Sequence, residues 1–247
     1  MKTNITYIDH SGFLVEWDNC YFLFDYYRGN IPKLDKNKML VVFVSHGHGD
    51  HFNPEIFKLY KEYPNTKYLI SSDIKINDHT RQKHDITDEL LQLIKIVMPN
   101  LEYELLDKDN NSILINTLKS TDIGVAFIIR YQDKTIYHAG DLNLWVWMGE
   151  TKQSNNDMRS RFLSEISKLK GSNIDIAFVP LDPRQEECYG LGMDELLKSV
   201  DVKYVFPMHF WDKPEIIQKY INETDVSRLS TMIMDIKKQG QSWSIEI

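Results

Sequence analysis

One stretch of the sequence, residues 41–51, limits the possible folds and functions of this chain more than any other. It begins with VVFV, within an apolar run at 39–44 that is typical of a strand buried on both faces. The polar run SHGHGDH follows at once. Three imidazoles and a carboxylate would each need a polar partner inside a protein, so they are costly as packing material. They suit a metal ion such as zinc, manganese or iron.

The candidate metal ligands in this run are His46, His48, Asp50 and His51. The two glycines between them have no Cβ, so the backbone can turn tightly and direct alternate side chains inward. The alternative interpretation is a polar loop in which histidines occur by chance, because a motif match stays a hypothesis until its context supports it.

This run resembles the His-x-His-x-Asp-His signature of the metallo-β-lactamase superfamily, which follows a buried strand. The branch that includes L-ascorbate-6-phosphate lactonase looks most similar, because His10-Ser11 and Phe24-Asp25 match its Gly-His-Ser/Ala turn and later Phe-Asp. The resemblance implies an α/β fold, the four-layer αββα sandwich, as a single domain over residues 1–247. It also implies one or two divalent metal ions, with zinc expected first and manganese or iron as alternatives.

The resemblance implies two further ligands. Asp141, in a Gly-Asp pair after an expected strand at 134–138, matches a carboxylate that can bridge two metals. His209, after an expected strand at 203–206, matches the last histidine of the superfamily. Without the upstream motif, the same residues would be an ordinary turn and a strand-end histidine bonded to a backbone carbonyl.

The sequence departs from the family pattern before Asp141, where residues 118–124 lack the expected third histidine. Ser120, Thr121 or Asp122 is a possible substitute, and so is water. Three alternatives follow. Two metals bind with an unusual first site, one metal binds in the second site, or the metal is manganese or iron, which accept more oxygen ligands than zinc.

Five more residues are candidates for contact with a substrate. Trp145 and Trp147 follow Asp141 and form either an apolar pocket wall or part of the core. Asp182 and Arg184 follow an expected strand at 174–180, and either bind a polar or anionic group or form a surface turn. His10 lies either at the rim of the site or in a structural turn.

Apolar periodicity predicts the helices. They are expected at 54–63, 87–98, 156–169, 194–200 and 214–222. The polar stretch 73–84 is expected to be a loop, and 242–247 an edge strand.

The net charge of −7 weakens any expectation of nucleic-acid binding. Two cysteines are too few for a disulfide scaffold. The sequence shows no signal peptide and no apolar run of the ~20 residues that span a bilayer. We therefore expect a cytoplasmic protein with a small-molecule substrate, no membrane association and no nucleic-acid partner, while its oligomeric state stays open.

The candidate metal ligands and the resemblance to the metallo-β-lactamase superfamily imply a metal-dependent hydrolase. The ions would lower the pKa of a bound water to around 7, and the hydroxide would attack a small ester, lactone or phosphoester. Asp50 would bind metal and orient the hydroxide. Phosphodiesterase or nuclease activity is the alternative within this class. Outside it, the chain is a non-catalytic metal- or ligand-binding protein with a degenerate first site, or a di-iron redox protein.

Overall fold

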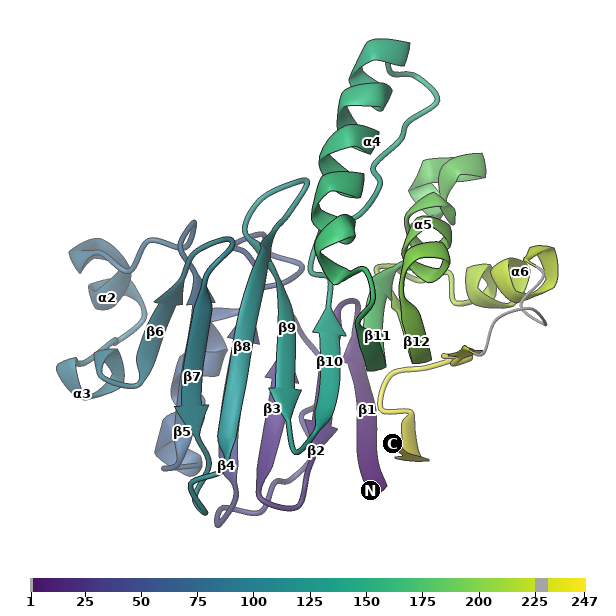
Figure 1. Ribbon diagram of the computed structural model, residues 1–247. Helices are drawn as coiled ribbons and strands as arrows, with labels where there is room; N and C mark the ends of the chain where they lie inside the picture. Colours follow the sequence, from purple (N-terminus) through teal and green to yellow (C-terminus); the bar gives the residue numbers. More distant parts are fainter. Residues whose placement is uncertain (1, 225–230) are drawn as a thin grey trace.

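Two seven-stranded sheets form the centre of the computed structural model, which describes residues 2–224 and 231–247. The first sheet contains, in spatial order, β14 (Ser242–Glu246), β1 (Lys2–Asp9), β2 (Gly12–Glu16), β3 (Cys20–Phe24), β4 (Met39–Val44), β5 (Thr66–Ser71) and β6 (Ile94–Val97). The second contains β13 (Met232–Ile233), β12 (Asp201–Met208), β11 (Asn173–Pro180), β10 (Lys134–His138), β9 (Val125–Tyr131), β8 (Ser112–Lys119) and β7 (Glu102–Leu106). Figure 1 shows the two sheets lying against each other.

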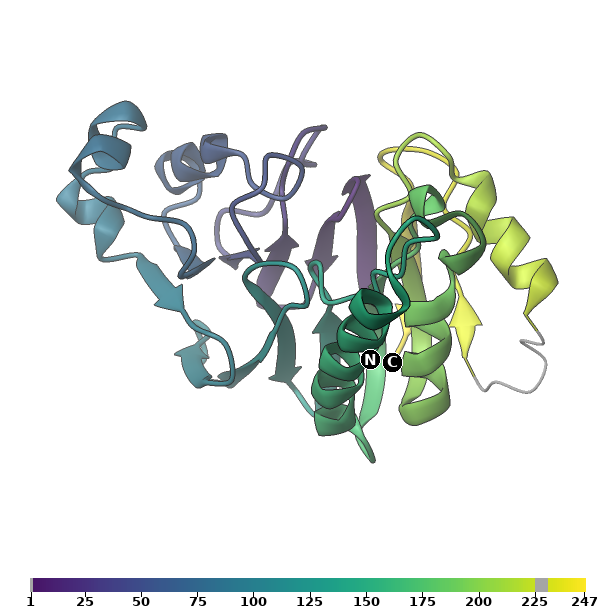
Figure 2. The ribbon, with the colours of Figure 1, turned by 90° about the horizontal axis from the view of Figure 1, so that it is seen from above.

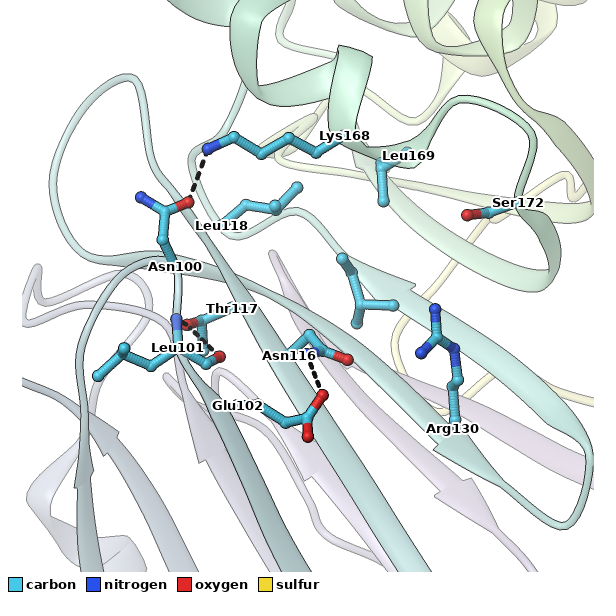
Figure 3. Close-up of a pocket in the computed structure, with 11 residues that line it drawn as sticks. Asn100, Leu101, Glu102, Asn116, Thr117, Leu118, Arg130, Lys168, Leu169 and Ser172 are labelled. Carbon is cyan, nitrogen blue, oxygen red and sulfur yellow. Dashed lines mark hydrogen bonds between the residues drawn. The ribbon is translucent and has the colours of Figure 1, made fainter.

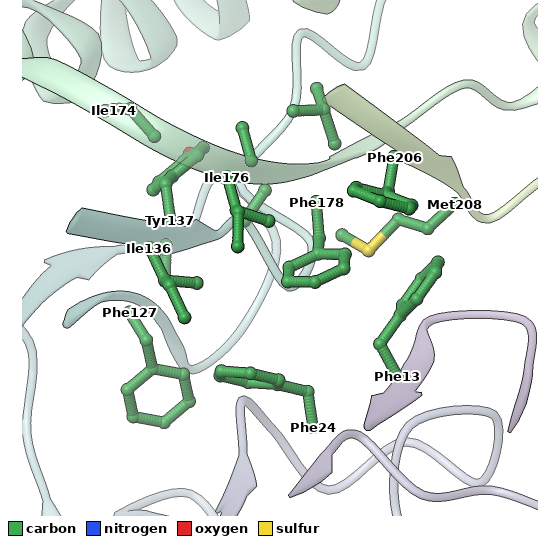
Figure 4. Packing of buried hydrophobic residues seen from close by; sticks show 14 of the residues in the cluster. Phe13, Phe24, Phe127, Ile136, Tyr137, Ile174, Ile176, Phe178, Phe206 and Met208 are labelled. Atoms are coloured by element: carbon green, nitrogen blue, oxygen red, sulfur yellow. The ribbon is translucent and has the colours of Figure 1, made fainter. Parts of the chain in front are cut away.

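The space between the sheets is filled by aromatic and branched side chains (Figure 4). Phe13 and Phe24 from the first sheet pack on Phe178 from the second, with ring centroids 4.4 and 5.6 Å apart. All six residues of β4 are buried, as expected for a strand covered on both faces. Alternate residues of β4 face the opposite side of the sheet and join a second apolar cluster there.

Helices cover the outer face of each sheet (Figure 2). The first sheet carries η1 (Pro54–Lys58), α1 (Leu59–Glu62), α2 (Asp78–Lys83) and α3 (Asp88–Leu91). The second carries α4 (Lys152–Ile166), η2 (Ser167–Leu169), η3 (Pro183–Cys188), α5 (Leu191–Ser199) and α6 (Glu215–Glu223). The order of layers is therefore helix, sheet, sheet, helix. Within 2–224 and 231–247, no helix has both the length and the apolar character to cross a membrane.

Two expected segments differ in the structure. Residues 87–98 are not one helix, because α3 ends at Leu91 and residues 94–97 form β6. The IKIV sequence of β6 is β-branched at three positions and pairs in parallel with β5, so sheet pairing overrides the helical spacing of the leucines. Residues 73–84 are not all loop, because Asn77 caps α2 by accepting a hydrogen bond from the Thr80 amide.

The parallel strands place the candidate residues at one edge of the sandwich. β3, β4 and β5 run parallel in the first sheet, and β10, β11 and β12 run parallel in the second. The carboxyl ends of neighbouring parallel strands lie at the same edge of a sheet, where open α/β proteins bind ligands. Residues 45–51, 139–141, 181–184 and 209 directly follow such ends.

Candidate metal centre

Eight side chains gather at this edge in two groups. Within each group, one ligand atom from every residue lies within 4.8 Å of the others. The first group consists of His46, His48, Asp122 and Asp141, and the second of His10, Asp50, His51 and His209. All six expected ligands are thus brought together, and Asp122 and His10 join them.

Asp141 lies between the two groups. Its Oδ2 is 3.4 Å from His46 Nε2, while its Oδ1 is 3.2 Å from His51 Nε2 and 3.4 Å from His209 Nε2. Each carboxylate oxygen therefore faces a different group. This is the arrangement that a carboxylate bridging two metal ions requires.

The chemistry of the donor atoms fits divalent ions. Four buried atoms here have no hydrogen-bond partner: His10 Nε2, His46 Nε2, His51 Nε2 and Asp141 Oδ1. Buried polar atoms are nearly always paired, so four unpaired donor or acceptor atoms at one place need an explanation. Imidazole nitrogens and carboxylate oxygens that lie this close together within each group are a ligand set for zinc and similar metals.

Three histidines of the centre are held by a polar partner behind the ring. Ser45 Oγ is 3.0 Å from His46 Nδ1. His51 Nδ1 contacts Asp25 Oδ2 at 2.8 Å, and His209 Nδ1 contacts Asp182 Oδ2 at 2.9 Å. A carboxylate at Nδ1 holds the proton there, which leaves the Nε2 lone pair free for a metal.

Asp25 and Asp182 therefore orient the candidate ligands His51 and His209. Asp182 was a candidate for substrate contact, but its side chain is fully buried and bonded to His209 and Arg184. Asp25 is equally buried, and it accepts hydrogen bonds from the amide and hydroxyl of Ser45 at 2.7 and 2.6 Å. Sequence reasoning noted Asp25 only as part of the resemblance and gave it no role.

Of the three substitutes for the missing histidine, Asp122 is the one in the first group. Its Oδ2 lies 3.6 Å from His48 Nδ1. Ser120 Oγ instead accepts a hydrogen bond from the Asp122 amide at 3.2 Å. Thr121 Oγ1 donates to the carbonyl of Asn143 at 2.6 Å and accepts from the amide of the same residue at 3.0 Å. Both hydroxyls are thus engaged in holding the loops.

His10 is closer to the centre than a rim position would be. It is buried, its Nε2 is 3.4 Å from Asp50 Oδ2, and its ring centroid is 4.2 Å from that of His209. Its backbone φ is 53°, and that of His209 is 64°. Left-handed backbone at residues other than glycine stores strain and concentrates at functional sites. The turn motif at His10-Ser11 was the sequence signal for this placement.

Two glycines let the loops of the second sheet approach the histidine loop. A Cβ on Gly124 would lie 2.1 Å from the carbonyl oxygen of Ser45, and a Cβ on Gly140 would lie 2.6 Å from Ser45 Cβ. Both glycines also have positive φ, 78° and 51°. Only glycine fits these positions without displacing Ser45, which carries the start of the metal-binding run.

Burial and neighbouring charges set the protonation of the centre. Burial lowers the pKa of His46 to about 4, so this ring is neutral. Burial also disfavours the charged form of His51, but Asp141 and Asp25 on its two sides outweigh this and raise its pKa. Burial disfavours the charge of Asp141 too, yet His51 and His209 hold its pKa well below the usual value. A metal ion in the second group must therefore displace a proton from His51.

A pocket of about 340 Å³ opens onto the two groups. It is lined by His48, Asp50, Thr121, Asp122, Asp141, Trp145, Trp147, Met158, Arg184 and His209. Trp145 is 8% exposed, and its Nε1 donates to the Asp141 carbonyl at 3.0 Å, so it supports the metal loop as well as forming the wall. The expected apolar wall and Arg184 both face this pocket.

A larger hollow of about 480 Å³ lies elsewhere, between the outer face of β7 to β9 and η2 (Figure 3). Four of its polar groups pair with one another: Lys168 with Asn100 at 2.7 Å, and Asn116 with Glu102 at 2.9 Å. None of the residues of the two groups lines it. We therefore assign the chemistry to the smaller pocket.

Comparisons with known proteins agree with this geometry. The model of the family described as Beta-lactamase superfamily domain matches residues 4–155. A UPF0173 metal-dependent hydrolase from Heliobacterium modesticaldum is 25% identical over 242 residues, covering 94% of this chain and 90% of that protein. Igni18, a metallo hydrolase from Ignicoccus hospitalis, superposes with a TM-score of 0.58 at 16% identity over 100% of both chains. The metallo-β-lactamase fold protein YhfI from Bacillus subtilis gives 0.59 at 14% identity over 98% of this chain and 99% of its own. The expected four-layer αββα fold is confirmed.

Proposed function

This chain belongs to the Beta-lactamase superfamily domain family, and we propose that it is a metal-dependent hydrolase of small esters, lactones or phosphoesters. The observation that carries the proposal is that four buried donor or acceptor atoms without a hydrogen bond, from His10, His46, His51 and Asp141, lie within the two adjoining groups. The name of the relative from Heliobacterium modesticaldum, a metal-dependent hydrolase, agrees with it. The active unit would be the single domain expected over residues 1–247.

The residues of the centre have separate tasks. When bound, divalent ions lower the pKa of a water molecule to around 7 and polarise the substrate oxygen. Asp141 would hold both ions, and Asp25 and Asp182 would keep the ligand histidines oriented. Asp50 lines the pocket, and although burial disfavours its charge, His10 and His51 hold its pKa below the usual value. Its ionised carboxylate could bind a metal ion and, as a hydrogen-bond acceptor, orient the hydroxide.

Nitrogen ligands suit zinc, which remains the expected metal. Asp122 places a second carboxylate in the first group, and this also suits manganese or iron. The carboxylate further weakens the non-catalytic alternative, whose support was a first site short of one ligand. The pocket of about 340 Å³ lies at the small end of ligand pockets, which favours a small molecule over a nucleic-acid chain. Cys20 and Cys188 are free thiols in the structure, and a cytoplasmic location stays a prediction.

The test is a hydrolysis screen of the purified protein loaded with zinc, manganese or iron. The panel contains aromatic and aliphatic carboxylic esters, lactones, phosphate monoesters and phosphate diesters. We expect turnover of at least one small substrate that is abolished by a chelator, restored by metal, and lost in Asp141→Ala. A fully metal-loaded protein that cleaves none of these compounds would argue against hydrolysis and favour the binding-protein alternative.

A further inference from the structure

We propose that the substrate carries a carboxylate or phosphate group apart from the bond that is broken, and that Arg184 binds this anion. The inference rests on the proposed hydrolase function and names the substrate class of the same pocket. It is carried by the way in which Arg184 is held, by its position beside the candidate ligands, and by the character of the other pocket walls.

One edge of the Arg184 guanidinium is fixed. Nε donates to both oxygens of Asp182, at 3.0 and 2.9 Å, and Nη2 also donates to Asp182. The guanidinium carbon lies 4.7 Å from the ring centroid of Trp211, so the planar group rests on an aromatic face. The other edge, with Nη1, has no hydrogen bond to any of the described residues, and the side chain is 51% exposed where it lines the pocket.

Such a guanidinium is ready to bind an oxyanion. A fixed, planar donor pair suits the two oxygens of a carboxylate or phosphate, and little conformational freedom is lost when they bind. The hydrogen bond to Asp182 raises the pKa of Arg184 further above its already high value, so the group stays charged. Because Asp182 is also bonded to His209, its negative charge is shared between two partners.

The Asp182 carboxylate sets the distance between Arg184 and the candidate ligand His209. Asp182 is fully buried and holds Arg184 on one side and His209 on the other. An anion on Arg184 would therefore lie at a fixed distance from the ion held by His209. This spacing would place one particular bond of the substrate at the centre, which is what a specificity-determining contact does.

The other residues that line the pocket indicate the chemical character of the rest of the substrate. Trp145, Trp147 and Met158 supply apolar surface, and the two indole rings are nearly parallel with centroids 6.1 Å apart. The other acidic groups of the pocket, Asp50, Asp122 and Asp141, belong to the ligand groups, where bound ions would offset their charge. The pocket thus fits a small organic anion with an apolar or aromatic part.

The test measures binding and not turnover. The zinc-loaded protein is titrated with 4-nitrobenzoate, with 4-nitrobenzylphosphonate and with the neutral 4-nitrobenzamide, and quenching of tryptophan fluorescence gives each dissociation constant. We expect at least one anion to bind about tenfold or more tightly than the amide, because a charge-assisted hydrogen bond is worth that much. Which of the two anions binds better distinguishes a carboxylate from a phosphate substrate.

Variants assign this preference to Arg184 and not to the metal. Arg184→Gln should bring anion and amide to within about twofold, whereas Arg184→Lys, which keeps the charge, should retain part of the difference. Arg130→Gln removes the same charge from the outer face of the second sheet and should leave the preference for the anions over the amide unchanged. Zinc content is measured alongside, and if Arg184→Gln loses zinc, the comparison of wild type with Arg184→Lys decides.

A wild-type protein that binds the amide as tightly as both anions would overturn the inference. A preference for the anions over the amide that is unchanged in Arg184→Gln would also overturn it. If Arg184→Gln loses zinc, an unchanged preference in Arg184→Lys would overturn it instead. Hydrolysis is judged separately by the substrate screen. A protein that shows the Arg184-dependent preference but cleaves nothing would refute the hydrolase and leave the anion site supported.

Discussion

Replacing Asp25 by asparagine should weaken metal binding without unfolding the protein. The Asp25 carboxylate accepts three contacts, from the Ser45 amide at 2.7 Å, the Ser45 hydroxyl at 2.6 Å and His51 Nδ1 at 2.8 Å. In Asp25→Asn, the amide oxygen can keep the Ser45 amide, but the NH₂ group, in the place of Oδ2, faces both the Ser45 hydroxyl and His51 Nδ1 as a donor. The ring must then move its proton to Nε2, where the metal should bind.

The size of the effect follows from these contacts. Loss of a carboxylate partner behind a ligand histidine costs roughly 10- to 100-fold in metal affinity. Since the contact with His51 is mispaired and the Ser45 hydroxyl can turn to accept from the NH₂ group, the metal-free protein should lose only about 1–3 kcal/mol of stability. Zinc affinity is measured by competition with a chromophoric chelator, and stability by thermal unfolding in excess chelator.

Asp107→Asn provides the matched control for Asp25→Asn. Asp107 is also buried, and it accepts hydrogen bonds from the Asn111 amide at 2.8 Å and the Tyr131 hydroxyl at 2.6 Å, but it touches neither ligand group. Its variant should lose stability and keep full zinc affinity. Zinc affinity that is unchanged in Asp25→Asn, or equally reduced in both variants, would refute the argument that Asp25 sets the tautomer of His51.

Three further predictions concern packing, protons and the metal itself. Gly140→Ala should destabilise the protein by about 2–4 kcal/mol in unfolding measurements and reduce its zinc affinity, because the new Cβ meets Ser45. The control Gly171→Ala, with φ 79° and open space around it, should lose less stability and keep its zinc affinity. Zinc affinity should rise between about pH 6 and pH 8, because the raised pKa of His51 makes protons compete at neutral pH; a flat profile would contradict this. Free zinc at about 100 times its dissociation constant should raise the melting temperature by roughly 5–10 °C over chelator-treated protein, and an equal melting temperature would exclude a site specific to the folded state.

Sequence alone could identify as candidate metal ligands only those residues that lie close together along the chain. His46, His48, Asp50 and His51 lie in one run after one strand, so their meeting needs only local geometry. Asp141 and His209 came from a resemblance that supplies the order of strands. The alternation of strands and helices fits several α/β folds, and the four-layer αββα sandwich was predicted from the resemblance.

Contacts between loops that are distant along the chain could not be predicted from the sequence. Thr121 is held away from the first group by hydrogen bonds to Asn143, twenty-two positions along the chain, and the sequence does not show this contact. The place of Asp25 behind His51 depends on the parallel pairing of β3 with β4. The error at residues 87–98 has the same origin, because β6 exists only through its pairing with β5.

Metal content of the purified protein, measured by mass spectrometry after loading, tests the central claim most directly. The two groups predict two ions in the wild type, one in Asp122→Ala and one in His209→Ala. Retention of both ions in Asp122→Ala would show that Asp122 does not complete the first site. A single ion in the wild type that is lost only in His209→Ala would contradict the dinuclear centre, and no ion under any loading condition would contradict the account as a whole.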